Sequence, residues 1–398
     1  MKQLYIIAVT LGMMFMTACS SDEPTADNTR RDIELTQSEI IVSEDMSEFN
    51  TELFKAFAEI EDKDDNLILS PFSISSYLSM QANYCSNITQ EQIFKALGSS
   101  NLDALNSFNA KIIAKLGKLD KSTTLNLANS VWFDQRFSLK PTAKDNLPDF
   151  FDADIFSCDP ENTITKSRIN NWIKQKTNDK ITDFYDGTPF ASMVINVLYF
   201  NSIWKDKFIK EDTEKQKFHV GEKIYMVDMM KRLNATEEIA KGRNFTACRR
   251  DFGNGAYKCT FILPDEDCDI NDFIAGISYN ELSALKFANT KCDLYVPKFE
   301  LRNKSDKLLK VFSTLGIYGI DTPLEVSAEN IIAIVRHESY IKLDEEGAKV
   351  AAATGDVIYW EALDPDKVYF RLDRPFIFMI NETSTNACIL TGRISKFK

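Results

Sequence analysis

The chain is 398 residues long, with 44% hydrophobic and 27% charged residues, which is ample for a large folded core and excludes a disordered protein. Its formal net charge of -12, without any Lys/Arg run interleaved with aromatics, argues against nucleic acid as a partner, because phosphate binding needs clustered cations. No internal repeat or low-complexity block interrupts positions 39–398, so we expect one large domain there.

The N-terminus is typical of a cleaved export signal. A basic start precedes an apolar run from Leu4 to Met16 that is too short to span a membrane as a helix. The run ends in Met-Thr-Ala-Cys19, which resembles a bacterial lipobox, so we expect a signal peptide over 1–18 and a lipid on Cys19. The protein would then be exported and anchored to the outer membrane or surface of a bacterium, with 19–38 as a polar tether. The alternative is an ordinary secretory signal with an incidental cysteine.

Helical and strand-like stretches alternate irregularly after the tether, which predicts a mixed α+β fold. The run at 194–200 is uninterrupted and rich in β-branched and aromatic residues, so a strand buried on both faces is expected. Helices are predicted over 47–60, 73–82, 89–97, 166–178 and 304–315. Further strands are predicted over 125–133, 256–263, 291–299, 330–343, 368–380 and 387–394.

The residues that carry enzymatic or metal chemistry are sparse. There are two histidines, without an H-E-x-x-H motif, a G-x-S-x-G elbow or a glycine loop for phosphate. We therefore predict no catalytic residue, no metal and no cofactor; a hydrolase whose Ser–His or Cys–His pair is distant in the chain stays open as an alternative. His337 lies in an apolar strand pattern and is expected as a hydrogen-bonded core residue. No two cysteines form a C-x-x-C pair, and most should be small buried side chains.

One segment, 345–355, consists of small residues with Val350 as its only large apolar side chain. It is too featureless to pack well as a core element. It is small enough, however, to slide between two existing strands. This composition indicates a protein that works by moving one segment rather than one with a fixed pocket.

Motifs along nearly the whole mature chain resemble the serpins. They occur in the family's order at 66–75, 125–133, 169–172, 196–200, 296–299, 315–317, 373–376 and 392–393. The resemblance implies a single domain over 39–398 with the serpin fold. That fold has three β-sheets surrounded by about eight or nine helices, and an exposed reactive-centre loop at about 345–366.

The resemblance also implies roles for single residues. Ser70, Ser73, Asn196 and His337 match the family's shutter, a polar cluster where the main sheet opens. A buried polar cluster of this kind costs little while it is satisfied and lets two strands separate cooperatively. Trp204 matches the breach, where insertion begins.

The hinge of the reactive loop is matched by ten consecutive residues: Glu345, Glu346, Gly347, Ala348, Lys349, Val350, Ala351, Ala352, Ala353 and Thr354. In the family, a protease that attacks the loop forms an acyl-enzyme, the freed loop inserts as a new strand, and the protease is carried away and distorted. Alternation along a strand places Ala348, Val350, Ala352 and Thr354 on the inward face. Asp356 shares that parity, where an unpaired carboxylate is costly.

The family's spacing, counted from Gly347 and back from 374–376, places the scissile bond at Glu361–Ala362. Glu361 suits a glutamyl endopeptidase, Tyr359 or Trp360 a chymotrypsin-like enzyme, and 357–358 an elastase-like one. The stretch 348–361 would span roughly 46 Å at about 3.3 Å per residue, of the order of a domain's length.

The sequence therefore predicts a monomeric suicide inhibitor of serine proteases, with cysteine proteases as a second target class. It predicts no nucleic-acid partner and contact with a membrane only through a lipid on Cys19. The alternative within the family is a non-inhibitory serpin that is a binding or structural protein, or a plain protease substrate. Large or charged hinge residues would favour that alternative, and this hinge mostly lacks them.

Overall fold

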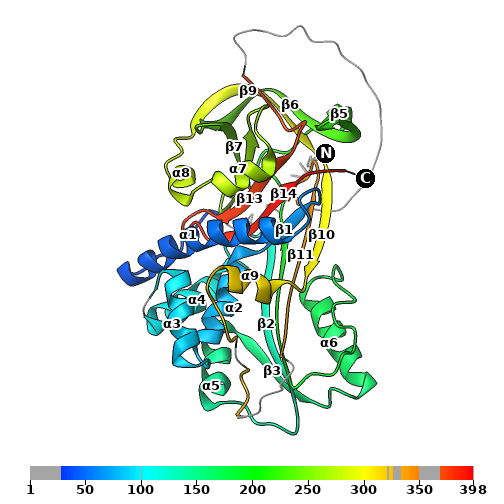
Figure 1. The fold of residues 1–398 in the computed structure, drawn as a ribbon. Coiled ribbons are helices and arrows are strands. Elements are labelled where there is room, and N and C mark those ends of the chain that lie inside the picture. The colour runs from blue at the N-terminus through cyan, green and yellow to red at the C-terminus, as the bar shows by residue number, and fades with distance from the viewer. Residues whose placement is uncertain (1–27, 100, 321, 326–332, 349–367, 398) are drawn as a thin grey trace, which may run out of the picture.

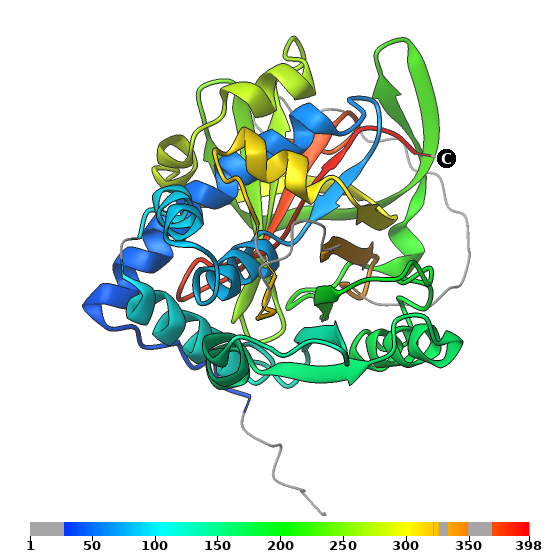
Figure 2. The same cartoon turned by 60° about the horizontal axis from the view of Figure 1, so that its bottom comes forward.

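The computed structural model describes residues 28–99, 101–320, 322–325, 333–348 and 368–397, in which two β-sheets are flanked by helices (Figure 1). The helices of these ranges are α1 (Gln37–Ile60), α2 (Pro71–Ala82), α3 (Asn87–Leu97), α4 (Leu102–Leu116), α5 (Pro141–Phe151), α6 (Thr163–Lys176), α7 (Ile270–Gly276), α8 (Tyr279–Ser283), α9 (Leu308–Thr314) and a 3-10 turn, η1 (Lys210–Asp212). Helices α1 and α9 lie side by side in both views (Figure 1, Figure 2). Among the described residues, no helix combines the length and apolar character needed to cross a bilayer.

The smaller sheet has five strands, in the order β10 (Phe299–Ser305), β11 (Ala333–Leu343), β4 (Ser192–Asn201), β2 (Thr124–Asp134) and β3 (Ala153–Cys158). Strand β4 is the uninterrupted run predicted at 194–200, and both of its faces are buried. Val194 and Leu198 belong to the main core, whereas Ile195 and Val197 pack in a second cluster with Trp172 of α6. The prediction of a strand covered on both faces is therefore confirmed.

The larger sheet runs β1 (Leu67–Leu69), β14 (Cys388–Ile394), β13 (Phe376–Glu382), β8 (Tyr257–Pro264), β7 (Phe245–Phe252), β6 (Lys223–Lys241), β9 (Ala288–Pro297) and β12 (Val368–Arg371), with β5 (Glu214–Val220) also paired to β6. The 19-residue strand β6 pairs with β7 at one end, with β5 at the other, and with β9 along most of its length. We expected three sheets, and the described strands form two, because the long strand β6 joins strands of the larger sheet into one. The predicted α+β architecture is confirmed.

The folded domain begins earlier than predicted. Helix α1 starts at Gln37 because Thr36 and Glu39 form a reciprocal capping box. Before it, Ile33 is 4% exposed and its backbone N–H donates to Ser384 Oγ at 2.9 Å. Asn28 donates to Asp120 at 2.9 Å. Residues of 28–38, a stretch that the sequence predicted as part of the tether, therefore contact the folded domain; 19–27 lie outside the described residues.

Two predicted elements have different boundaries in the structure. The strand predicted over 368–380 is two strands, β12 and β13, because Pro375 and its neighbours cannot continue a central ladder. The helix predicted over 304–315 is shortened to α9, because β10 extends to Ser305. All seven described cysteines are free thiols, five of them buried, in line with the prediction of small core side chains.

Candidate functional site

The polar residues Ser70 and Ser73, at the start of α2, come together with Asn196 and His337 of the five-stranded sheet, and all are buried. Ser70 is the N-cap of α2, where its Oγ accepts from the backbone N–H of Ser73 at 3.3 Å. Its own N–H donates to His337 Nε2 at 3.0 Å. His337 and Asn196 are register partners across β11 and β4. One contact thus joins the start of α2 to the junction of these two strands.

The protonation of His337 follows from this contact. The ring is 3% exposed, and burial lowers its pKa to about 4, so it is neutral at physiological pH. Because Nε2 accepts from a backbone N–H, the ring proton is assigned to Nδ1. The Oγ of Ser339 lies 2.8 Å from the same Nε2. Sequence reasoning missed Ser339, although it is two residues from His337 on the same face of the strand.

Asn196 is held from the other side of the sheet junction. Its Nδ2 donates to Asn129 Oδ1 at 2.6 Å, and Asn129 in turn donates to the carbonyl of Phe151 at 2.7 Å. Two atoms, Ser73 Oγ and Asn196 Oδ1, have no hydrogen-bond partner among the described residues. They border a cavity of about 10 Å³ that His337 also lines. The cluster is therefore satisfied incompletely at the point where β4 and β11 meet.

Strands β4 and β11 are parallel neighbours over eight residue pairs, from Ser192 opposite Ala333 to Tyr199 opposite Tyr340. Beyond Tyr340, β11 continues to Leu343 paired only with β10. The two strands therefore diverge at this end of their seam. The chain leaves β11 at the same place, into the predicted hinge.

A tight turn at Asp344 to Gly347 reverses the chain. The N–H of Asp344 donates to the carbonyl of Gly347 at 2.8 Å, and the reverse bond is 3.1 Å. The N–H of Ala348 then donates to the carbonyl of Ser202 at 2.7 Å, and Gly347 bridges antiparallel to Ile203. Ala348 is 4% exposed and part of the main core. The predicted hinge thus enters the diverging end of the seam, where Ala348 is bonded to the residue that follows β4.

Glycine is required at position 347. Its φ is +139°, a conformation that L side chains rarely adopt. A Cβ there would lie 2.3 Å from the carbonyl oxygen of Ser202 and 2.6 Å from the Cα of Ile203. Backbone atoms cannot yield as a side chain would, so the close approach of the hinge to the end of β4 depends on this residue.

Ion pairs hold the two glutamates of the turn. Glu345 is buried and lies 2.9 Å from Lys298 Nζ, and it accepts from Thr213 Oγ1 at 2.8 Å. Burial acts to raise the pKa of Glu345, but the bonds from Lys298 and Thr213 outweigh it and hold the pKa below its usual value. Glu346 is exposed and pairs with Lys207. Neither Lys298 nor Thr213 was predicted from sequence, because both partners are remote in the chain.

Trp204 is buried directly beneath the turn. Its ring stacks on Phe252 with centroids 4.3 Å apart, and its Nε1–H donates to the carbonyl of Asp344 at 3.0 Å. The guanidinium of Arg250 lies 4.7 Å from the centre of the ring, in cation–π geometry, and Nε of Arg250 bonds to Glu237 at 3.2 Å. The predicted breach tryptophan therefore contacts the hinge itself.

The remaining predicted loop residues lie outside the described residues. They are Lys349, Val350, Ala351, Ala352, Ala353 and Thr354 of the hinge, Asp356, the alternatives Tyr359 and Trp360, and the predicted bond Glu361–Ala362. Cys19 also lies outside them. Of the ten hinge residues, the structure places the first four.

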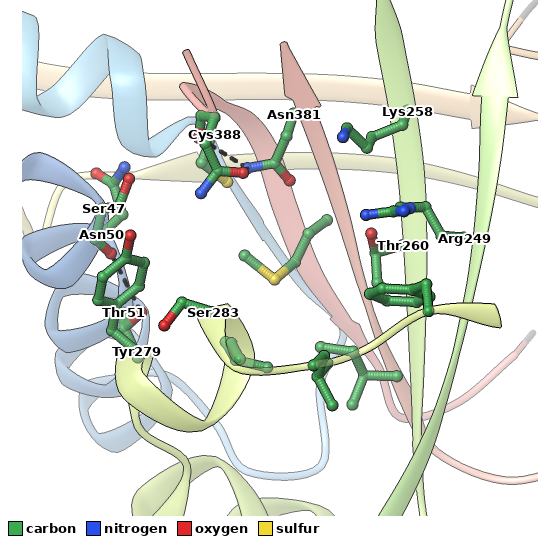
Figure 3. A pocket seen from close by; sticks show the side chains of 16 residues that line it. Ser47, Asn50, Thr51, Arg249, Lys258, Thr260, Tyr279, Ser283, Asn381 and Cys388 are labelled. Atoms are coloured by element: carbon green, nitrogen blue, oxygen red, sulfur yellow. Dashed lines mark hydrogen bonds between the residues drawn. The ribbon is translucent and has the colours of Figure 1, made fainter. Parts of the chain in front are cut away.

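A separate cavity of about 260 Å³ lies between α1, α8 and the strands β7, β8 and β13 (Figure 3). Asn50 lines it; this side chain is 6% exposed, and its Oδ1 has no partner among the described residues. Arg249 and Lys258 lie on the opposite wall, and Arg249 is paired with Glu238 at 2.7 Å. Burial, followed by the nearby Arg249, lowers the pKa of Lys258. The cavity has a mixed polar and apolar lining, and its volume is slightly below that of a usual small-molecule site.

Comparison with known proteins matches this arrangement to one family. A family model described as Serpin (serine protease inhibitor) matches residues 44–397. The chain is 28% identical over 390 residues to Iripin-2 of Ixodes ricinus, covering 90% of this chain and 94% of that protein. The fold is similar to the thermophilic serpin tengpin in its native state, with a TM-score of 0.79, 26% identity and coverage of 93% and 97%. It is also similar to thyroxine-binding globulin in complex with thyroxine, with a TM-score of 0.77, 20% identity and coverage of 89% and 98%. The predicted serpin fold is confirmed, and the chain belongs to the serpin family.

Proposed function

We propose that this serpin inhibits serine proteases as a suicide substrate, by inserting 348–361 between β11 and β4. The observation that carries the proposal is the seated Ala348, whose N–H bonds to Ser202 at the diverging end of the seam. The turn at Gly347 already directs the chain back along β11. Insertion would extend this bond into a ladder on both sides of the new strand, without a new change of chain direction.

The order of strands suits such an insertion. Strands β4 and β11 are parallel to each other, so a chain that reverses after β11 runs antiparallel to both. The small, uncharged residue at Ala348 fits the buried position it occupies. The rest of the inward set, Val350, Ala352 and Thr354, is proposed to follow with the same parity.

The trigger is proposed to be cleavage at Glu361–Ala362. The protease serine attacks the carbonyl carbon of Glu361, the bond to the nitrogen of Ala362 breaks with a proton delivered to that nitrogen, and an acyl-enzyme remains. A target that accepts Glu361 is a glutamyl endopeptidase; cleavage after Tyr359 or Trp360 would indicate a chymotrypsin-like enzyme. Cysteine proteases form a corresponding thioester and are a second target class.

We further propose that the protein is exported and held at a bacterial surface by a lipid on Cys19, and acts there as a monomer. The lipobox-like sequence before Cys19 supports this. Metabolic labelling with a fatty acid analogue should mark the wild type and fail to mark Cys19→Ser. Equal labelling of both would exclude this cysteine as the attachment site.

The inhibitory function is tested with a panel of serine and cysteine proteases. We expect a complex with at least one glutamyl or chymotrypsin-like enzyme that survives SDS electrophoresis. Mass spectrometry of the released C-terminal peptide then identifies the cleaved bond. Clean cleavage without complex, followed by a large rise in thermal stability, would show insertion without trapping and would contradict the proposal.

A second candidate function, carriage of a small molecule, is favoured by the cavity at Asn50 alone. The likeness to thyroxine-binding globulin, at 20% identity, carries the fold and not the ligand. An amphipathic organic anion fits a wall that presents Arg249 and Lys258. Saturable binding of such an anion, abolished by Lys258→Met and accompanied by no protease complex, would favour this function over inhibition.

A further inference from the structure

Asp120, in the loop between α4 and β2, is the centre of a hydrogen-bond network. It is 3% exposed and carries no salt bridge within 4 Å among the described residues. Its carboxylate accepts instead from Asn28 Nδ2 at 2.9 Å, from the N–H and Oγ of Ser122, from Thr123 Oγ1 at 2.9 Å and from the N–H of Asn254 at 3.3 Å. Burial acts to raise the pKa of Asp120, but the bonds from Asn28, Ser122 and Thr123 outweigh it and keep the carboxyl ionised.

The ionised carboxylate fixes the direction of the next bond. A carboxylate can only accept, so Thr123 gives its single hydroxyl proton to Asp120. Thr123 Oγ1 also lies 2.6 Å from Ser202 Oγ, and with its proton committed it must accept there. Ser202 is therefore the donor, and its side chain is held in one orientation at the end of β4.

Ser202 is also the residue whose carbonyl receives the N–H of Ala348, at 2.7 Å. The neighbouring Ile203 carbonyl accepts from Gly253 at 2.8 Å, and Gly253 lies so close to the Asp120 carboxylate that a Cβ would be 1.8 Å from it. The Asp120 network thus supports the segment 202–203 from the side opposite the hinge. At its far end, Asn28 belongs to the segment that precedes α1.

We propose that Asp120 is a positioning residue for loop insertion: through Thr123 and Ser202 it holds the carbonyl that seats Ala348, and through Asn28 it couples this point to the N-terminal segment. Its consequence for inhibition rests on the proposed function. The bond from Ala348 to Ser202 is the first bond of the inserted strand and forms before cleavage. Losing this bond delays insertion, and the acyl-enzyme has more time to hydrolyse. More inhibitor is then cleaved for each protease trapped.

The test compares amide hydrogen exchange of the peptide that contains 344–348 in the wild type, Thr123→Val and Thr123→Ser. Valine has the shape of threonine without the hydroxyl and spares the bonds of Asn28 and Ser122 to Asp120. We expect exchange in this peptide to rise about two- to tenfold in Thr123→Val, the effect of one lost hydrogen bond, and Thr123→Ser to restore it. Ser202→Ala, which keeps the backbone carbonyl, should give the same rise and replaces Thr123→Val if that variant does not fold.

The matched control is Thr391→Val. Thr391 lies on β14, and its buried hydroxyl donates to the carbonyl of Phe378 on β13 at 3.1 Å. This variant should lower the melting temperature as Thr123→Val does, without changing exchange at 344–348. Equal exchange in Thr123→Val and the wild type, or an equal rise in Thr391→Val, overturns the proposal. The number of inhibitor molecules consumed per protease trapped should rise about twofold or more in Thr123→Val alone. If the wild type traps no protease, the proposed function fails, and the exchange comparison still decides the role of Asp120.

Discussion

The indole nitrogen of Trp204 donates a 3.0 Å hydrogen bond to the backbone carbonyl of Asp344, the first residue of the turn that reverses the chain after β11. A buried side chain on one segment is thereby bonded to the backbone of the segment that is proposed to move. The backbone N–H of Trp204 also donates to the carbonyl of Glu346 at 2.7 Å. The hinge is thus held at two points by one residue.

Trp204→Phe should lower the free energy of unfolding by about 2–3 kcal/mol, because it leaves the Asp344 carbonyl without its donor and removes part of the ring stacked on Phe252. Urea denaturation followed by fluorescence measures this. Trp132→Phe is the matched control: Trp132 is equally buried, donates to Ser130 Oγ at 3.0 Å and stacks on Phe156 at 4.1 Å, but lies away from the hinge. Both variants should lose similar stability, and only Trp204→Phe should change the fraction of protease trapped. An identical fraction of trapped protease in both variants would show that Trp204 has no specific effect on the hinge.

Ala348→Arg should convert the inhibitor into a substrate. The position is buried, and an unpaired guanidinium cannot enter the core without a large desolvation cost. We expect the yield of SDS-stable complex to fall about tenfold or more, while the rate of loop cleavage stays close to that of the wild type. Ala348→Ser, which is small and uncharged, should retain the complex. A full yield from Ala348→Arg would mean that this residue does not insert.

Gly347→Ala should destabilise the protein by about 2–4 kcal/mol, because its Cβ meets backbone atoms and its φ is unfavourable for alanine. Gly316→Ala isolates the second of these causes. Gly316 has a φ of +78° and nothing within 4 Å of an added Cβ, so it should cost only about 1 kcal/mol. The difference between the two, measured by denaturant unfolding, reports the close approach of the hinge to β4. Equal losses of stability in the two variants would show that the turn relaxes around the added Cβ at no cost.

His337 makes stability depend on pH. Its pKa is lowered from 6.5 to about 4 in the folded state by burial, so between these values the unfolded chain binds more protons. Its contribution to stability is therefore complete above pH 6.5, is lost as the pH falls, and levels off near pH 4. The total amounts to about 3 kcal/mol at about 1.4 kcal/mol per pH unit.

This dependence appears as the difference between melting curves of the wild type and His337→Gln from pH 7 to 4. The variant removes the titrating ring but leaves all carboxylates in place, so the difference isolates one group. A parallel pair of curves for the wild type and His337→Gln would contradict the assignment of a neutral buried ring.

The sequence predicted those parts of the fold in which one local pattern decides the outcome. The run at 194–200 has no polar residue except Asn196, and it is a strand buried on both faces. The helix predicted over 89–97 ends at Leu97 in the structure, where Gly98 follows with a φ of +71°. The order of strands could not be derived in this way, because the pairing of β11 with β4 joins segments more than 130 residues apart. It came with the resemblance to the serpins.

Site residues could be named from the sequence where each lies in a short family motif, as Ser70 and His337 do. Hydrogen-bond partners that lie in polar loops carry no such motif and were missed. Asp120 has the sequence context of an ordinary surface residue, Asp-Lys-Ser-Thr, and only the fold links it to Ser202 through Thr123. The start of α1 was missed for a related reason: Glu39 is buried, although Gln37 and Ser38 before it are polar and exposed. Its burial is compensated by Lys111, which comes from a different helix.

The parallel seam between β4 and β11 has one more consequence. A single ladder of hydrogen bonds there would be replaced by two when an antiparallel strand enters, whereas entry between β10 and β11 would offer that strand only one antiparallel neighbour. If the loop inserts as proposed, the uncut molecule has a more fully bonded arrangement available to it than the one it occupies. Its useful lifetime is then set by a barrier and not by an equilibrium, so warming shortens it as it shortens the half-life of a slow reaction. For such a molecule, the half-life of the uninserted form at a stated temperature describes stability better than a melting temperature does.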